Sequence, residues 1–287
     1  MTYYLTVSTS IAIVMISVLG THLLTGMNGM FSLGQAAFMG LGAYTSAILV
    51  VSAGVPFPIA VVISIAFTMI IAMLVGFATL RIRQDFFALA TFGFGQAMIG
   101  LFTESVQLTG GSLGFTNIPR ITTPTMAFVS LAVCIFLVWG IRKSHFGRDS
   151  LAIRGNEMAA KSSGINIFRH KMIMLLISAA FAAYAGVLLA FNNRYIDSNS
   201  FGWMIAVTWI IIVFFGGRDS LFGTILGGII LLVLPEVLRF AAEWRITLYC
   251  ITILFIINLM PKGLFGSINI SLKPLTRLFT KKPSEVD

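Results

Sequence analysis

Long apolar segments recur along this chain and constrain its fold more than any other feature. A helix rises 1.5 Å per residue, so it needs about 20 residues to cross a hydrocarbon core about 30 Å thick. The backbone must satisfy its own hydrogen bonds in lipid, and the apolar runs lack the strict alternation of barrel strands. The sequence therefore predicts an all-α, polytopic transmembrane helical bundle of about eight to ten spans. Nine segments qualify, at approximately 4–24, 33–53, 56–80, 86–105, 121–141, 172–191, 203–217, 221–239 and 246–260.

Two of these segments are weaker than the others. Segment 86–105 carries Thr91, Gln96 and several glycines, and segment 203–217 is short. Either one fits a broken or re-entrant helix as well as a full span. The first segment has no basic residues before it and no small-residue cleavage pattern after it, so it is expected to remain as an anchor.

The balance of apolar and charged residues excludes a soluble protein. The chain is 57% hydrophobic and 10% charged, whereas soluble domains have about 45–50% apolar and about 25% charged residues. A cytosolic enzyme, a secreted disulfide scaffold and a disordered regulator are therefore not expected. Cys134 and Cys250 are the two cysteines, and both lie in apolar runs. We predict no disulfide framework, no metal site and no cofactor.

The net charge of +9 is unevenly distributed. Seven of the 19 Lys and Arg residues lie in 142–171 and five lie after residue 261, so the charge indicates membrane topology rather than a nucleic-acid surface. Placing 142–171 inside puts fifteen basic residues on the cytoplasmic side and four outside, with the N-terminus outside and the C-terminus cytoplasmic. We expect one transmembrane domain over 1–287, a cytoplasmic loop at 142–171 and a basic cytoplasmic tail at 262–287.

The loop at 142–171 has apolar residues spaced as in an amphipathic helix. Asn156 is a plausible N-cap, and Gly164 is a plausible stop because glycine readily adopts the left-handed conformation. Two interpretations remain open. The helix lies on anionic lipid headgroups, or it docks in a groove of a partner protein through the small residues Ala159 and Ala160, which look buried.

Four stretches of the chain together resemble the permeases of bacterial ABC importers for branched-chain amino acids. The joint match covers the chain from about residue 20 to 240 and is specific, although each stretch alone would be weak. The resemblance implies packed transmembrane helices in the cytoplasmic membrane, paired with a second homologous permease, cytoplasmic ATP-binding subunits and an external substrate-binding protein. The stretches are RGNEMAAKSSGINIFRHK at 154–171 followed by ISAAFAAYAG at 177–186, GMFSLGQAAFMGLGAYT at 29–45, LTGGSLGF at 108–115, and FGGRDSLFGTILG at 215–227.

The same resemblance implies that the loop 142–171 couples the permease to the ATPase. The wider importer pattern has Glu-Ala-Ala, three residues and then Gly. Here the matching register reads Met158, Ala159 and Ala160, and Glu157 stands one place early. A direct contact of Glu157 with the ATPase therefore does not follow from the resemblance. The implied coupling residues are Arg154, Glu157, Ala159, Ala160 and Gly164.

Polar and small residues inside the spans indicate where a pathway could run. The glycines at 26–42 fit close helix packing, and they also fit a broken helix whose free N–H groups face a substrate carboxylate. Gly223 and Gly227, like Ala182 and Gly186, favour packing. Polar residues in spans usually face protein or water, with interhelical hydrogen bonding as the alternative. The pathway candidates are Ser32, Gln35, Tyr44, Thr91 and Gln96.

An enzyme and an ion-coupled carrier are weaker alternatives. Residues 110–114 fit the G-x-S-x-G pattern, but all three histidines are expected on the other side of the membrane from Ser112 and no strand precedes the motif. The chain has no P-loop, so the energy must come from a partner. Its acidic residues lie in loops, in the tail or at span ends, which argues against ion coupling. The resemblance implies an importer permease for leucine, isoleucine and valine, with urea or short amides as the nearest alternative substrates because related permeases share the same loops.

Overall fold

The computed structural model describes residues 2–81, 84–238, 250, 254 and 263. In this part of the chain the structure is helical, and the paired extended backbone is a single antiparallel bridge between Phe115 and Ile196. The elements follow one another as α1 (Thr2–Thr21), the π-helix η1 (His22–Met27), α2 (Gln35–Val51), α3 (Phe57–Thr79), α4 (Gln84–Glu104), α5 (Val106–Thr109), the 3-10 helix η2 (Gly111–Leu113), α6 (Pro124–Lys143), α7 (His145–Gly155), α8 (Glu157–Ser162), α9 (Ile167–Asn193), the 3-10 helix η3 (Ser198–Phe201), α10 (Trp203–Gly216) and α11 (Leu221–Val237).

The long helices confirm the predicted polytopic bundle. Of the described residues, six segments are long and apolar enough to cross a membrane, and α2 and α11 are apolar but shorter. These eight match the predicted segments to within a few residues, except at the start of α9, and the ninth, at 246–260, falls almost entirely outside the described residues. Segment 86–105 proves to be one continuous helix, and segment 203–217 is preceded by η3. The six are Tyr3–Met27, Phe57–Thr79, Phe86–Glu104, Pro124–Lys143, Ile167–Asn193 and Ser198–Gly216.

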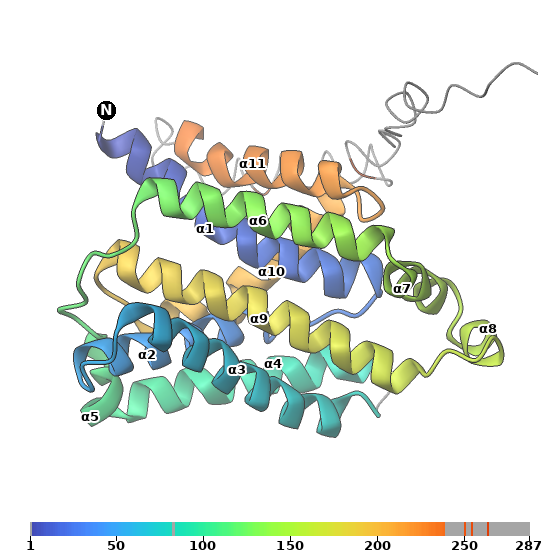
Figure 1. The fold of residues 1–287 in the computed structure, drawn as a ribbon, viewed down its shortest axis with the longest axis horizontal. Coiled ribbons are helices and arrows are strands. Elements are labelled where there is room, and N and C mark those ends of the chain that lie inside the picture. The colour runs from blue at the N-terminus through green and yellow to red at the C-terminus, as the bar shows by residue number, and fades with distance from the viewer. Residues whose placement is uncertain (1, 82–83, 239–249, 251–253, 255–262, 264–287) are drawn as a thin grey trace, which may run out of the picture.

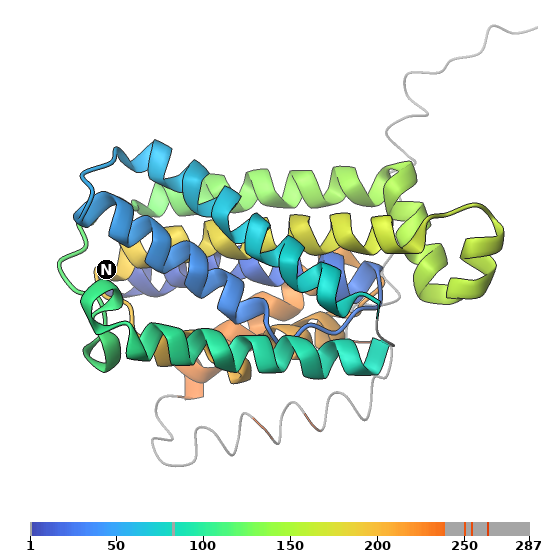
Figure 2. The ribbon, with the colours of Figure 1, turned by 90° about the horizontal axis from the view of Figure 1, so that it is seen from below.

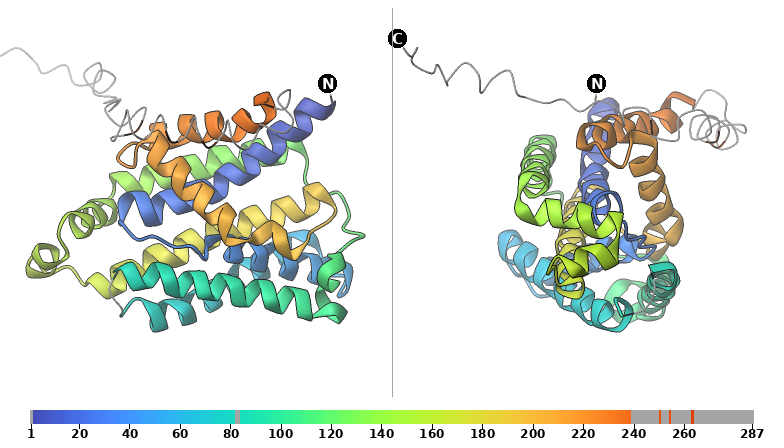
Figure 3. Two further views of the ribbon diagram at one scale, coloured as in Figure 1. Left: turned by 180° about the vertical axis from the view of Figure 1, so that it is seen from behind. Right: turned by 90° about the vertical axis from the view of Figure 1, so that its right-hand side faces the viewer.

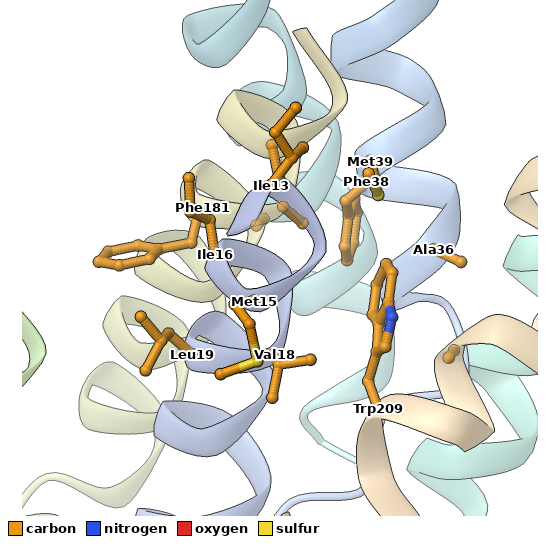
Figure 4. Close-up of a cluster of buried hydrophobic side chains, with 14 of the residues drawn as sticks. Ile13, Met15, Ile16, Val18, Leu19, Ala36, Phe38, Met39, Phe181 and Trp209 are labelled. Carbon is orange, nitrogen blue, oxygen red and sulfur yellow. The ribbon is translucent and has the colours of Figure 1, made fainter. Parts of the chain in front are cut away.

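The centre of the bundle is formed by α1, α2 and α9. Most residues of α1 and α9 are buried, whereas α3, α4 and α6 bury less than a third of theirs. The two further views in Figure 3 show α6 and α3 at the periphery. Apolar side chains of α1, α2 and α9 meet Trp209 of α10 in one cluster, in which the Trp209 ring points toward Phe38 (Figure 4). Because α1 and α9 have few lipid-facing residues, they form the core, while the outer helices meet the lipid.

Small residues allow α2 and α9 to approach closely. A Cβ at Gly42 would lie 2.3 Å from the carbonyl oxygen of Ala183, and a Cβ at Gly186 would lie 1.9 Å from that of Met39. A Cβ at Gly227 would similarly lie 2.7 Å from Cα of Gly216. The predicted packing role of these glycines is confirmed, since any larger residue would push the helices apart.

The helical structure is interrupted between α1 and α2. After η1, residues 28–34 run back into the bundle without helical structure, and α2 begins inside it (Figure 2). At 1.5 Å per residue α2 is about 25 Å long and α9 about 40 Å, so the non-helical segment replaces the missing part of a full span. Non-helical backbone at membrane depth must be enclosed by protein or line a water-filled cavity, and all of residues 28–34 except Phe31 and Leu33 are buried. Both alternatives left open for 26–42 apply, since the helix is interrupted at 28–34 and Gly34 and Gly42 lie close to neighbouring backbone.

Helices α7 and α8 project from one end of the bundle, and the N-terminus lies at the opposite end with α5 (Figure 1). We call the first of these the α7–α8 end. Asn156 caps α8 as predicted, because its side chain accepts hydrogen bonds from the backbone N–H groups of Met158 and Ala159 at 2.9 and 3.1 Å. Gly164, with φ of +86°, follows the end of α8, which confirms the predicted stop.

Candidate functional site

The start of α2 is held inside the bundle by a contact with α4. The backbone N–H of Leu33 donates to Oγ1 of Thr91 at 3.1 Å, and a Cβ at Gly34 would lie 2.7 Å from the Thr91 carbonyl oxygen. Gly34 precedes the helix, and no side chain caps the first turn. The first N–H groups of α2 therefore lack a side-chain acceptor at this buried end, where the helix dipole is positive.

Two buried polar atoms next to this helix start have no partner among the described residues. Gln35 donates from Nε2 to Oγ of Ser178, which in turn donates to the carbonyl oxygen of Gly20 at 2.7 Å. Oε1 of Gln35 and Oγ of Ser32 receive or donate no hydrogen bond within the described part of the chain, and both residues are at most 1% exposed. Such atoms are costly in an apolar interior unless something hydrogen-bonds to them.

Aromatic side chains form the apolar surroundings of this helix start. Phe38 and Phe94 have ring centroids 5.2 Å apart, and a Cβ at Gly34 would lie 3.2 Å from the Phe94 ring. Trp209 is 1% exposed and points toward Phe38 from α10 (Figure 4). Donors, an acceptor and apolar rings thus lie in one region around the start of α2, a combination of groups that a small amphiphilic molecule could use.

The structure separates the remaining pathway candidates from this group. Tyr44 lies nine residues further along α2, about 13 Å away by helix rise, and stacks on Phe102 at 4.4 Å between ring centroids. Its hydroxyl oxygen is buried and has no partner among the described residues. Gln96 is exposed on α4. Ser32, Gln35 and Thr91 are therefore gathered at one place, while Tyr44 and Gln96 are not.

A second cluster lies at the α7–α8 end around Arg154. The Arg154 guanidinium donates to the carbonyl oxygen of Gly26 and pairs with the carboxylate of Asp219. Arg142 donates to the backbone carbonyl of the same aspartate. A Cβ at Gly29 would lie 2.8 Å from Cγ of Arg154. The end of α7 is thus connected both to the residues that lead into 28–34 and to the loop between α10 and α11.

Helix α8 is attached to α9 by a second ion pair. Nζ of Lys171 lies 2.5 Å from Oε1 of Glu157. Ala160 is buried, as expected, but Ala159 is exposed, so the expectation that both alanines are buried is wrong for Ala159. The two residues are adjacent in a one-and-a-half-turn helix, and only one of them can face the protein. Met158 beside them is 80% exposed, so α8 presents an uncovered surface.

Sequence reasoning missed three residues that complete these clusters. Ser178 is a polar residue inside a span, so the rule that selected Gln35 also applies to it. Asp219 is an acidic residue in a loop, and Arg142 is one of many basic residues. No pattern in the sequence indicates that these two meet Arg154. Within the described residues, no three His, Cys, Asp or Glu side chains gather as metal ligands.

Comparison with protein families gives one match over most of the chain. A family model described as the branched-chain amino acid transport system permease component matches residues 3–259. The region contains both clusters described above, together with every helix from α2 to α11. No solved structure matches the chain.

Curated relatives agree with this match. The chain is 28% identical to the high-affinity branched-chain amino acid transport system permease protein LivM of Salmonella typhimurium, over 90% of the chain and 69% of that protein. It is 28% identical to the LivM protein of Escherichia coli, over 86% of the chain and 66% of that protein. A ribose import permease of Bacillus subtilis, RbsC, is 22% identical over 77% of the chain and 80% of that protein. The alignments thus span about two thirds of the length of the two LivM relatives.

Proposed function

Because the chain belongs to the family of branched-chain amino acid transport system permease components, we propose that it is the membrane-spanning subunit of an ABC importer for leucine, isoleucine and valine. The importer lies in the bacterial cytoplasmic membrane. The chain itself is not an enzyme, and its partners hydrolyse the ATP. The family match and the two LivM relatives support the transport class, and the buried polar atoms at the start of α2 support an amino acid as the substrate.

The substrate meets the chain at the start of α2. An amino acid carries a carboxylate, an ammonium group and, in this substrate class, a branched apolar side chain. The uncapped N–H groups of α2 and the hydroxyl of Ser32 donate to the carboxylate. The free Oε1 of Gln35 accepts from the ammonium group, and Phe38 and Trp209 surround the apolar side chain. The unpartnered atoms of Ser32 and Gln35, both buried, are the observation that carries this proposal.

The other pathway candidates have lesser roles in this proposal. Thr91 positions the segment 28–34 through its bond to Leu33, without touching the substrate. Tyr44 lies further along α2 toward the end that carries α5, so it meets the substrate at a different point of the transport route. Gln96 is exposed on α4, where it faces a neighbour of this chain in the assembled importer.

Coupling to the ATPase runs through α8 and Arg154. The exposed surface of α8 at Met158 and Ala159 meets the ATP-binding subunit. Buried Ala160 and the Glu157–Lys171 pair transmit its displacement to α9. Gly164 ends the helix, and Arg154 transmits the displacement to Gly26, which lies two residues before the non-helical segment. Helix α8 and Arg154 therefore connect the ATP-binding subunit to the start of α2, where the substrate binds.

The α7–α8 end faces the cytoplasm in this proposal. The loop 142–171 carries seven basic residues, which are retained on the cytoplasmic side. The N-terminus lies at the opposite end (Figure 1) and is therefore outside, where the binding protein delivers the substrate. The basic segment 262–287, cytoplasmic by the same rule, lies outside the described residues except for Gly263. The whole chain forms one transmembrane domain that pairs with a second homologous permease in the bilayer.

Reconstitution tests the proposal. The chain is placed in liposomes with its partner permease and ATP-binding subunits, and the binding protein is added outside. Uptake of radiolabelled leucine should require ATP and should be reduced by unlabelled isoleucine and valine, but not by urea or acetamide. Competition by urea would indicate that the substrate is a short amide and not an amino acid. Uptake by the chain alone, driven by an ion gradient without ATP, would show a secondary carrier.

A further inference from the structure

A cavity of about 790 Å³ opens where the end of α3, helix α8 and the start of α9 meet. It is separate from the start of α2, and the transport route proposed above does not use it. Figures 1 and 2 both show the end of α3 beside the first turns of α9, close to the projecting helix α8. The cavity therefore lies where the bundle leaves the membrane.

Basic side chains from three different segments line this cavity. Arg81 lies two residues after the end of α3, Lys161 comes from α8 and Lys171 from α9. The one carboxylate among its described lining residues is Glu157, and that group is already paired with Lys171 at 2.5 Å. Arg81 and Lys161 have no ion-pair partner in the part of the chain that the structure describes. Its described lining residues thus carry an excess of two positive charges.

The first turn of α9 adds to this positive field. Ile167 and Phe168, the first two residues of the helix, line the cavity. The side chain of the N-cap residue Asn166 accepts from the backbone N–H of Arg169 at 3.1 Å, so it does not cap the N–H groups of these two residues. A helix of 27 residues has a positive N-terminus. Two cations without an ion-pair partner and a helix N-terminus together suit a phosphate group.

The remaining wall of the cavity is apolar and continues onto the surface of α3. Phe168 lies with its ring centroid 5.8 Å from that of Phe77. Phe77, Leu74 and Met73 are 42, 61 and 44% exposed, and they extend from the cavity along the lipid-facing side of α3. A free phosphate would not use this surface, whereas the acyl chains of a lipid would cover it.

We propose that this cavity binds the headgroup of an anionic phospholipid, with its phosphate at Arg81, Lys161 and the α9 N-terminus and its acyl chains along α3. The inference does not depend on the transported substrate and needs only that the α7–α8 end lies at a membrane surface. A bound headgroup connects α8 to α3 and α9 through Lys161 and thereby stabilises the position of the helix that we assign to coupling.

Native mass spectrometry of the purified transporter tests the site. The protein is titrated with phosphatidylglycerol or phosphatidylcholine, and retained lipid is counted for wild type, the double variant Arg81→Gln/Lys161→Gln and the control Lys143→Gln. Lys143 is also basic and lies at the same end of the bundle, but its Nζ lies 3.8 Å over the ring of Trp139 on α6. Each basic residue near a headgroup contributes about fivefold to binding, so the double variant should bind phosphatidylglycerol about 25-fold more weakly. The control should bind as wild type does, and phosphatidylcholine should show no difference.

A second measurement on the wild type keeps the test independent of how the variants fold. In nanodiscs with phosphatidylglycerol, Lys161 should react more slowly with an acylating reagent than in phosphatidylcholine, while Lys143 changes little. Equal protection of both lysines, or equal lipid retention by the double variant, would overturn the proposal. Displacement of the lipid by millimolar inorganic phosphate would assign the cavity to a free anion. Loss of the ATP-binding subunit from the double variant, with lipid retained, would assign it to a protein contact instead.

Discussion

Arg154, in the last turn of α7, pairs with Asp219 in the loop between α10 and α11, and its guanidinium also donates to the carbonyl oxygen of Gly26. These partners are 65 and 128 residues away in sequence. One side chain thus joins the segment we assign to coupling, the end of η1 and the loop before α11. The side chain of Arg154 is 17% exposed and that of Asp219 is 59% exposed, so the pair lies at the edge of the protein, where a change in α7 can reach both partners.

Replacing Arg154 with glutamine should weaken coupling without preventing membrane insertion. The variant loses the two simultaneous contacts of the guanidinium, one to the Asp219 carboxylate and one to the Gly26 carbonyl oxygen. The planar, forked guanidinium of arginine is suited to making both at once. Because Asp219 is largely exposed, we expect about a three- to tenfold loss in leucine transported per ATP hydrolysed. Uptake and ATP hydrolysis are measured in the same proteoliposomes.

Arg148→Gln is the matched control, since Arg148 lies on the same helix and its exposed side chain donates to the Lys143 carbonyl at 3.1 Å. It should keep the wild-type ratio of transport to hydrolysis. If Arg154→Gln also kept that ratio, the cluster would be structural only.

Ser32→Ala should lower substrate affinity without lowering stability, whereas Gln35→Ala should lower both. The hydroxyl of Ser32 has no partner among the described residues, so Ser32→Ala removes no hydrogen bond within the described part of the chain and should not lower the apparent Tm. A hydrogen bond to a charged group contributes about 1.5–3 kcal/mol, so leucine affinity should fall about tenfold or more. Gln35→Ala should lower both, because it also removes the bond to Ser178.

Ser46→Ala is the control on the same helix. Ser46 is buried, and its hydroxyl donates to the Ala43 carbonyl within α2. Its loss should leave leucine affinity unchanged. Unchanged leucine affinity in Ser32→Ala would show that the substrate does not bind at this position.

The sequence predicted the helices well but not how their ends meet. Apolar length alone located α3, α6 and α9, since a membrane span has a required length. The cap at Asn156 and the stop at Gly164 were also predictable, because both depend on neighbouring residues. The contacts of Arg154 were not, since they join residues far apart in the chain and depend on how α7 turns back onto the bundle. The sequence pattern also could not predict which residues of a helix as short as α8 are exposed, and it wrongly predicted that Ala159 is buried.

Ala159 and Ala160 should respond differently to a glutamate. Ala159 is exposed and Ala160 is buried, so Ala159→Glu should fold normally and lose coupling, whereas Ala160→Glu should also lower the apparent Tm. A buried unpaired charge costs several kcal/mol. Thermal unfolding and ATP-driven uptake are measured for both. Normal uptake by Ala159→Glu would argue that α8 does not meet the ATPase.

Gly42→Ala should destabilise the bundle. The added Cβ would lie 2.3 Å from the Ala183 carbonyl oxygen, which is backbone and cannot move aside alone. Overpacking of this kind costs about 1–3 kcal/mol, so the apparent Tm in detergent should fall. Gly93→Ala on α4 is the control, since a Cβ there meets nothing within 4 Å. That variant should be neutral or slightly more stable, because alanine favours a helix by up to about 1 kcal/mol over glycine. Equal Tm values for both variants would contradict the close packing of α2 on α9.

Cysteine labelling should place the α7–α8 end in the cytoplasm. Ser162 on α8 and Ser112 in η2, which directly follows α5, are both exposed, and α8 and α5 lie at opposite ends of the bundle (Figure 1). Serine-to-cysteine changes at these positions should therefore disturb little. In a chain with Cys134 and Cys250 replaced, and expressed without the ATP-binding subunits, a membrane-impermeant maleimide should label Ser112→Cys in cells whose cytoplasmic membrane is intact. Ser162→Cys should react only after that membrane is permeabilised. The reverse pattern would put the Arg154 cluster and α8 on the side without ATP, where no nucleotide-driven subunit could reach them, and the proposed coupling route would fail with it.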